Sequence, residues 1–165
     1  MKQIFSVTLA LLSFIIVEAR PITKAQPIGI QDTDHSTPPD TKMANDILSY
    51  VNAYRQKKGL PALAMNAVIS AQAQKHSENM AAHRTAFGHN GFQTRMNNIS
   101  SQLGGANATA ENVAFGNMDA KQVVDTWLTS PGHKANIEGP YNLTGIGIAA
   151  DSKGNLYFTQ IFIAH

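Results

Sequence analysis

The stretch TGIGIAADSKGNLYFTQIFI (residues 144–163) decides the fold class of this chain. Its two halves, residues 144–150 and 156–163, are rich in β-branched and aromatic side chains, and the polar stretch DSKGN between them is typical of a tight turn. We therefore predict a β-hairpin. Gly145 and Gly147 leave one face of its first strand without side chains, which indicates that another element packs closely against that face.

Upstream of the hairpin, apolar residues recur at the spacing expected for helices. In the last predicted helix, Trp127 falls on the face that we expect to be buried. Helices followed by a hairpin favour an α+β fold with an antiparallel sheet over a fold built from βαβ crossovers. The predicted helices span residues 42–58 (capped by Asp40 or Thr41), 67–83 (capped by Asn66), 92–99 and 119–129 (capped by Asn117 or Asp119), and residues 100–110 are predicted to form a loop.

The N-terminal residues are typical of an export signal. Lys2 is followed by an apolar run that is too short to span the roughly 30 Å of a bilayer core, and small residues precede a cleavage point after Ala19. The residues that follow are rich in proline and polar side chains, with few apolar groups to bury. We predict a signal peptide over residues 1–19, a flexible leader or pro-segment over 20–40 and one domain over 41–165, and hence a secreted, extracellular protein with no membrane span.

Composition excludes several functional classes. The formal net charge is only +2, and the lysines and arginines are scattered, whereas a nucleic-acid-binding protein needs a clustered basic surface. The chain has no cysteine, which excludes disulfides, a lipid-modified cysteine anchor and a cysteine nucleophile. It also lacks the sequence signatures of serine hydrolases, zinc proteases and phosphate-binding loops.

Three polar segments remain as candidates for function: FGHNG (residues 87–91), AENVA (110–114) and SPGHKAN (130–136). Each places an ionisable residue beside glycine or other small residues, a setting in which a side chain can face a cleft rather than the core. Taken singly, none of these segments defines a site, because a histidine in a loop is more often an ordinary surface residue.

Between residues 47 and 162 the sequence resembles the CAP superfamily, which comprises the cysteine-rich secretory, antigen 5 and pathogenesis-related class 1 proteins. Without cysteine, it is most similar to the disulfide-free SCP-domain branch, which is common in bacteria and occurs in some fungi. The segments that carry the resemblance follow the family's order: VNAYR (51–55), GLPAL (59–63), AQKHSENMA (73–81), FGH (87–89), AENVA (110–114), WLTSPGHKANI (127–137), TGIGI (144–148) and YFTQIF (157–162).

The resemblance implies an α-β-α sandwich with a central antiparallel sheet flanked by helices, and a cleft that holds two histidines and two glutamates. His89, Glu111 and His133 match three of these four cleft residues, and Asn112 stands beside Glu111 in the same motif. The family's second glutamate lies shortly after the tryptophan, where this chain has Ser130. That departure puts any chemistry that requires two carboxylates in doubt.

The resemblance also implies that zinc or another divalent metal binds weakly at His89 and His133. Judged from the residues alone, two imidazoles with Glu111 nearby suit such an ion, and a hydrogen-bonded polar cluster that orders three loops is an equally open interpretation. His76 and His83 lie two helical turns apart, about 10 Å, so we do not expect them to share an ion. We expect His76 to lie outside the cleft.

Members of the family in fungi and plants bind sterols or fatty acids, and many act at host–microbe boundaries. The resemblance therefore implies an extracellular binding protein for a small lipid or sterol and favours a non-enzymatic role over catalysis. The alternative is a metal-dependent hydrolase, in which an ion held by the His/Glu cleft lowers the pKa of bound water. Three N-glycosylation sequons, at Asn98, Asn107 and Asn142, would matter only in a eukaryotic host.

Overall fold

The structure, a computed structural model, describes residues 39–165, so the predicted signal peptide and almost all of the predicted leader lie outside the described residues. Helices and strands follow one another in the order expected for an α+β fold. They are α1 (Pro39–Lys57), β1 (Ala64–Met65), α2 (Ala67–Ala81), α3 (Phe92–Leu103), β2 (Ala108–Gly116), α4 (Ala120–Thr129), α5 (Pro131–Glu138), β3 (Leu143–Ala150) and β4 (Leu156–Ala164).

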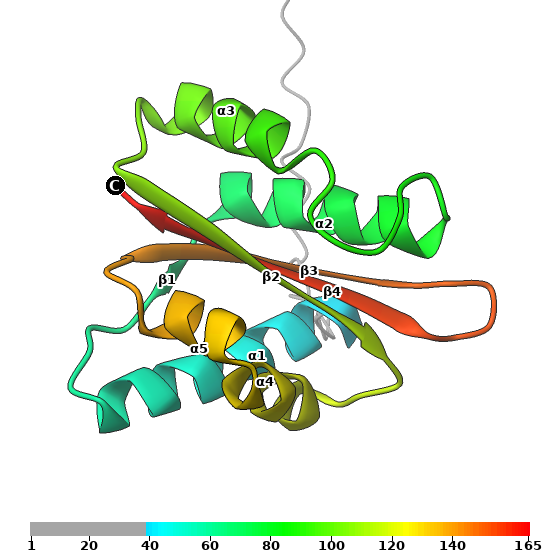
Figure 1. The fold of residues 1–165 in the computed structure, drawn as a ribbon, viewed down its shortest axis with the longest axis horizontal. Helices are drawn as coiled ribbons and strands as arrows, with labels where there is room; N and C mark the ends of the chain where they lie inside the picture. The colour runs from blue at the N-terminus through cyan, green and yellow to red at the C-terminus, as the bar shows by residue number, and fades with distance from the viewer. Residues whose placement is uncertain (1–38) are drawn as a thin grey trace, which may run out of the picture. The chain divides into compact units, whose positions relative to one another are not determined.

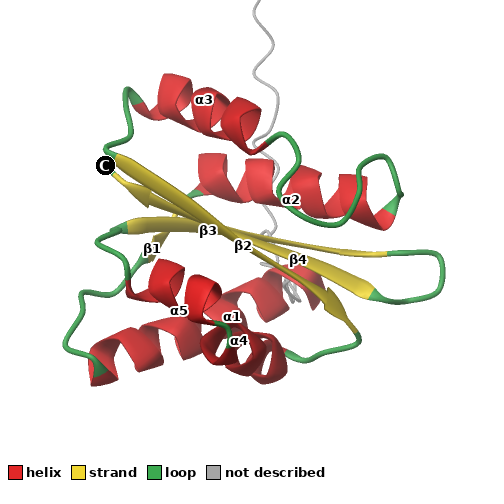
Figure 2. Ribbon diagram, viewed as in Figure 1, coloured by secondary structure: helices red, strands yellow, loops and turns green. Residues whose placement is uncertain are grey.

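The predicted α-β-α sandwich is confirmed. The described residues form a sheet with the strand order β1-β3-β4-β2, in which β4 pairs antiparallel with both β2 and β3. Figure 1 shows α2 and α3 on one face of this sheet and α1, α4 and α5 on the other, and Figure 2 shows the same layers by type of secondary structure. The short strand β1 pairs parallel with β3, so the sheet is mixed at that edge, and not wholly antiparallel as expected.

The predicted hairpin is also confirmed. Strands β3 and β4 pair from Leu143 opposite Ile163 to Ala150 opposite Leu156. The turn between them is held by Asp151, whose carboxylate accepts hydrogen bonds from the backbone and side chain of Asn155 and from the backbone of Lys153.

The two glycines of β3 are where α2 meets the sheet. A Cβ atom at Gly145 would overlap the backbone of Ile69 and Ser70, and one at Gly147 would overlap the backbone of Ala73 and Gln74. The close packing predicted from the glycine spacing is therefore confirmed, and the element that packs there is α2.

Two of the predicted helix caps are confirmed, whereas the predicted cap of the first helix at Asp40 or Thr41 is wrong, because α1 already begins at Pro39. The side chain of Asn66 accepts hydrogen bonds from the backbone of Val68 and Ile69 at the start of α2. Asp119 begins α4 with a capping box, in which its carboxylate accepts from the backbone of Gln122 while the Gln122 side chain accepts from the backbone of Asp119.

The prediction of a loop over residues 100–110 is wrong. Helix α3 continues to Leu103, and β2 already begins at Ala108. Helices cover both faces of the sheet, so residues 110–114 are all buried and their sequence has no polar–apolar alternation. The sequence therefore does not indicate a strand there. A further helix, α5, follows α4 directly, with Pro131 at its first position, where the missing N–H of proline carries no penalty.

Side chains from the helices bind the outer edges of the sheet. On β3, the amide of Gln74 donates to the carbonyl of Ile148 (2.8 Å) and accepts from its N–H (2.9 Å). On β2, Trp127 donates from its indole nitrogen to the carbonyl of Val113 (3.2 Å). Trp127 is 0% exposed, as predicted for a core residue.

A buried arginine, Arg55, connects α1 to the segment between α5 and β3. Its guanidinium donates hydrogen bonds to four backbone carbonyls, and burial lowers its pKa from the usual arginine value. The acceptors are the carbonyls of Pro61, Ile137, Gly139 and Tyr141. The position of α5, which carries His133, therefore depends on a residue near the end of α1.

Candidate functional site

The candidate site lies across β2, the edge strand. Glu111 and Asn112 are neighbours on this strand, so their side chains point to opposite faces of the sheet. Glu111 contacts residues of the α2–α3 layer, whereas Asn112 contacts α5. The two helical layers thus both contact the middle of β2, each from its own face of the sheet.

Glu111 is the centre of the site, and it is only 5% exposed. Arg95 of α3 holds its carboxylate with two parallel hydrogen bonds, from Nε to Oε2 (2.9 Å) and from Nη2 to Oε1 (2.7 Å). The Nδ1 atom of His89 lies 2.9 Å from Oε1 of the same carboxylate. A two-pronged arginine–carboxylate pair of this kind fixes both groups in orientation as well as in charge.

The loop that carries His89 is attached on both sides of that residue. The carbonyl of Gly88 lies 2.8 Å from Nε2 of His76, and the carbonyl of Asn90 accepts a hydrogen bond from Nη1 of Arg95 (2.7 Å). Between these two attachments the His89 side chain remains 51% exposed. His89 therefore has a fixed backbone and a ring that is open to solvent.

As expected, His76 does not line the hollow beside Glu111, but it is buried directly behind that carboxylate. His76 is 2% exposed, and its Nε2 atom lies 3.9 Å from Glu111 Oε1. It shares the sheet-facing side of α2 with Ala73 and Met80, which places its ring behind the cleft. Burial is the main cause that lowers the pKa of His76, and the charge of Arg95 lowers it further.

His133 enters the site from the other side of the sheet, in the first turn of α5. Burial lowers its pKa, and the charge of His89 lowers it further. Helix α5 is bound to β2 by Asn112, which donates to the His133 carbonyl (3.1 Å), and by Asn136, which donates to Asn112 Oδ1 (2.9 Å).

The structure thus brings His89 and Glu111 into direct contact, whereas His133 is tied to β2 through its backbone carbonyl, which Asn112 bonds. Asn112 is fully buried and anchors α5, so it supports the cleft rather than lining it. Sequence reasoning missed Arg95. The available signal was a charged residue one turn before Ile99, on a helix face that is otherwise buried.

As for metal ligands, no group of three or more His, Cys, Asp or Glu side chains within residues 39–165 is arranged to hold an ion. Both oxygens of the Glu111 carboxylate accept hydrogen bonds from Arg95, and Oε1 also lies 2.9 Å from Nδ1 of His89, so the carboxylate is already engaged at both oxygens. The hollow beside it has a volume of about 210 Å³ and is lined by His89, Phe92 and Glu111. The donor set that is left consists of two imidazoles.

The three sequon asparagines, Asn98, Asn107 and Asn142, are all exposed, but their surroundings differ. The side chain of Asn142 bonds both the N–H and the carbonyl of His165. Asn98 lies within α3, and Asn107 precedes β2 directly.

Fold and cleft together define a class, that of CAP-domain proteins. A sequence profile of the cysteine-rich secretory protein family (CAP) matches residues 48–162, and the chain belongs to this family. It is 31% identical over 119 residues to the uncharacterized protein YkwD of Bacillus subtilis (strain 168), a match that covers 71% of this chain and 45% of YkwD. The matched part of the chain therefore spans less than half the length of that relative.

Solved structures agree with this fold. An outer surface protein from Borrelia burgdorferi superposes with a TM-score of 0.67 at 23% identity, over 75% of this chain and 93% of that protein. An extracellular protein containing an SCP domain from Bacillus anthracis gives a TM-score of 0.61 at 23% identity, over 76% and 41% of the two chains. These neighbours include extracellular and outer-surface proteins, and none of the helices in the described part of this chain is long and apolar enough to cross a membrane.

Proposed function

We propose that this CAP-domain protein is secreted and binds a small lipid, a fatty acid or a sterol, without catalysing a reaction on it. The observation that carries the proposal is a groove between α1 and α4, with a volume of about 440 Å³. Ligand sites for small molecules usually measure several hundred Å³ and are largely apolar, with a few polar groups that orient the ligand. Lipid-binding members of the family use a flexible loop or a groove between helices, and the residues of those sites have no match in this sequence. A role at a host–microbe boundary is part of the proposal.

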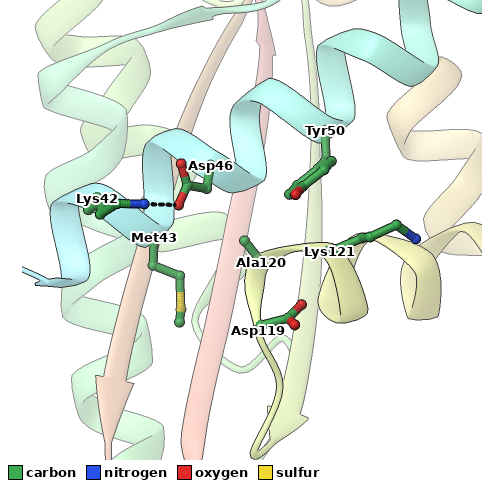
Figure 3. Close-up of a pocket in the computed structure, with 7 residues that line it drawn as sticks. All are labelled: Lys42, Met43, Asp46, Tyr50, Asp119, Ala120 and Lys121. Atoms are coloured by element: carbon green, nitrogen blue, oxygen red, sulfur yellow. Dashed lines mark hydrogen bonds and ion pairs between the residues drawn. The ribbon is translucent and has the colours of Figure 1, made fainter.

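The lining of this groove suits an amphipathic ligand. Figure 3 shows Tyr50 reaching from α1 toward the first turn of α4, with Met43 and Ala120 further along the groove. Tyr50 is 43% exposed although it is large and aromatic, so its ring offers apolar surface that the fold leaves unburied. The other four of the seven lining residues, Lys42, Asp46, Asp119 and Lys121, are charged, so this groove is more polar than most small-molecule sites and its apolar part is the side of Tyr50, Met43 and Ala120.

The charges of the lining suit a polar ligand head group. Lys42 pairs with Asp46 at 2.7 Å, one helical turn apart on the exposed face of α1. Lys121 pairs in the same way with Asp125 on α4 (2.7 Å). Exposed ion pairs of this kind contribute little to stability, so either lysine can turn to a carboxylate or hydroxyl of the ligand at small cost.

The cleft supports binding over catalysis. Glu111 is held at both oxygens by Arg95, and the second glutamate of the family is replaced by Ser130, so the cleft formed by residues 39–165 offers no unpaired carboxylate as a general base. A zinc ion, if bound, would lower the pKa of a coordinated water. We infer that a divalent metal binds only weakly, through His89 and His133, and that the alternative of a metal-dependent hydrolase is the weaker proposal.

The test is lipid capture by the secreted protein. We expect mass spectrometry of extracts from purified protein to show a fatty acid or sterol, and labelled palmitate or cholesterol to bind in solution. Tyr50→Ala should weaken this binding, because it removes the aromatic wall of the groove.

The matched control is a variant in a second hollow, which lies between α1 and α2 and has a volume of about 510 Å³. Ala71 lines that hollow and is exposed, so Ala71→Gln should narrow it and leave lipid binding unchanged. If Ala71→Gln loses lipid binding and Tyr50→Ala keeps it, then the ligand binds in the second hollow and not in the groove between α1 and α4. A protein that retains no lipid, together with metal-dependent turnover, would favour the hydrolase.

A further inference from the structure

Arg95 is a charged side chain in the wall of the cleft, and it belongs to none of the three polar segments of the family motif. It is only 8% exposed, and its guanidinium makes three short hydrogen bonds. Two go to the oxygens of Glu111, and the third, from Nη1, goes to the carbonyl of Asn90 (2.7 Å). Glu111 contacts the ring of His89, and Asn90 is the next residue after His89 in the sequence.

The hydrogen-bond partners of His89 and His76 determine the tautomers of these two rings. A carboxylate paired with arginine offers only acceptors, so Nδ1 of His89, 2.9 Å from Glu111 Oε1, carries the ring proton as the donor. The carbonyl of Gly88 is likewise only an acceptor, so His76 is protonated at Nε2. In the neutral His89 ring, the lone pair is therefore on Nε2, away from Glu111.

We propose that Arg95 is a positioning residue, which acts through Glu111 and the Asn90 carbonyl to hold His89 in its Nδ1–H tautomer and present Nε2 to the cleft as a lone pair. A cleft of this kind accepts a hydrogen-bond donor or a Lewis-acidic cation at His89. The inference concerns the ligand-free protein, so it goes beyond the proposed function and holds whether or not the groove between α1 and α4 binds lipid.

The geometry requires an arginine and not simply a positive charge. The planar guanidinium places Nε and Nη2 on the two oxygens of Glu111 while Nη1 points to Asn90, which the single ammonium of a lysine does not reproduce. The loop passes close to the guanidinium. A Cβ atom at Gly91 would lie 3.3 Å from Nη1 of Arg95, and Gly91 has a φ of 77°, which glycine adopts without strain.

The test is nitrogen-15 NMR of the imidazole rings in the metal-free protein, with the His89 signals assigned by their loss in His89→Gln. We expect wild-type His89 to show one protonated nitrogen, Nδ1. In Arg95→Met, Glu111 loses its fixed orientation, and we expect His89 to exchange between both tautomers. A wild-type ring protonated at Nε2, or an Arg95→Met variant that keeps a single Nδ1–H tautomer, would overturn the proposal.

Two further variants keep the experiment decisive. Arg95→Lys retains the charge beside Glu111 if Arg95→Met does not fold, and it should also show both tautomers. A lysine variant with only the Nδ1–H form would show that charge alone is enough, against the proposal. Arg84→Met is the matched control, because Arg84 bonds Asn79 and the Glu78 carbonyl and should leave the His89 spectrum unchanged.

Discussion

Trp127 of α4 donates a hydrogen bond from its indole nitrogen to the carbonyl of Val113, which ties the core of one helical layer to the edge strand β2. Trp127 is fully buried and packs in the cluster that also contains Phe158 and Phe162 of the central strand β4. We expect Trp127→Ala to lower the free energy of unfolding by about 3–5 kcal/mol, the usual cost of removing a large core aromatic.

The measurement for Trp127 is a urea denaturation curve. Trp127→Phe keeps most of the apolar surface and loses the hydrogen bond, so it should cost clearly less than the alanine variant. A urea midpoint of Trp127→Ala close to that of the unchanged protein would show that the side chain contributes little to the core.

The packing of α2 on β3 predicts a second effect on stability. Gly147→Ala places a methyl group against the backbone of Ala73 and Gln74, so helix and sheet must separate, at a cost of about 1–3 kcal/mol or more. Gly132→Ala is the control, because nothing lies within 4 Å of the added methyl group. Equal melting temperatures for the two variants would contradict the close contact.

Zinc binding predicts a pattern among the histidine variants. By calorimetric titration we expect His89→Ala and His133→Ala each to abolish weak binding of zinc. His76→Ala is not a suitable control, although the sequence alone suggests it, because His76 holds the Gly88 carbonyl beside His89. His83 is the better control, since it is exposed and packs against Tyr157. Binding should weaken below about pH 6, because protonated imidazole does not bind metal.

Buried His76 predicts how stability depends on pH. Its pKa is lowered in the folded protein, chiefly by burial, and the charged or titratable groups around it are Arg95, Glu111 and His89. The unfolded chain, with a histidine pKa near 6.5, therefore binds a proton more readily, and stability falls as pH drops below that value. His76→Gln should reduce this loss between about pH 7.5 and pH 5.5, measured by urea denaturation. If the free energy of unfolding falls by the same amount between these two pH values in His76→Gln, then His76 is not the cause of the pH dependence.

Export predicts the start of the mature chain. If residues 1–19 form a cleaved signal peptide, the intact mass of protein recovered from the medium should correspond to a chain that begins near Arg20. A membrane-bound chain that still begins at Met1 would contradict both the cleavage and the secretion.

Much of this architecture could be predicted from local features of the sequence. The hairpin followed from side chains suited to strands around a turn, and the Asn66 and Asp119 caps followed from residue type and position. Strand β2 could not be predicted in this way, because helices bury both of its faces and leave no alternation. Its existence depends on tertiary packing, which a single sequence reports poorly.

The candidate site shows the same division. His89 and Glu111 could be named because the family motif contains them, and the structure brings them into contact. Arg95 and His76 could not be named, because each lies on a helix among core residues and looks like a surface charge or a helix-face histidine until the layers are assembled. The contacts that orient the cleft come from residues distant in sequence, and no local spacing indicates them.

The side chains bound to the sheet edges have a consequence for the protein at high concentration. An exposed strand edge can recruit a strand from another molecule, and a domain without disulfides has no covalent constraint against such exchange. Here Gln74 occupies both backbone groups of Ile148 at one edge, and Trp127 occupies the Val113 carbonyl at the other. These side chains take the positions of a neighbouring strand, so the sheet resists growth into strand-paired aggregates.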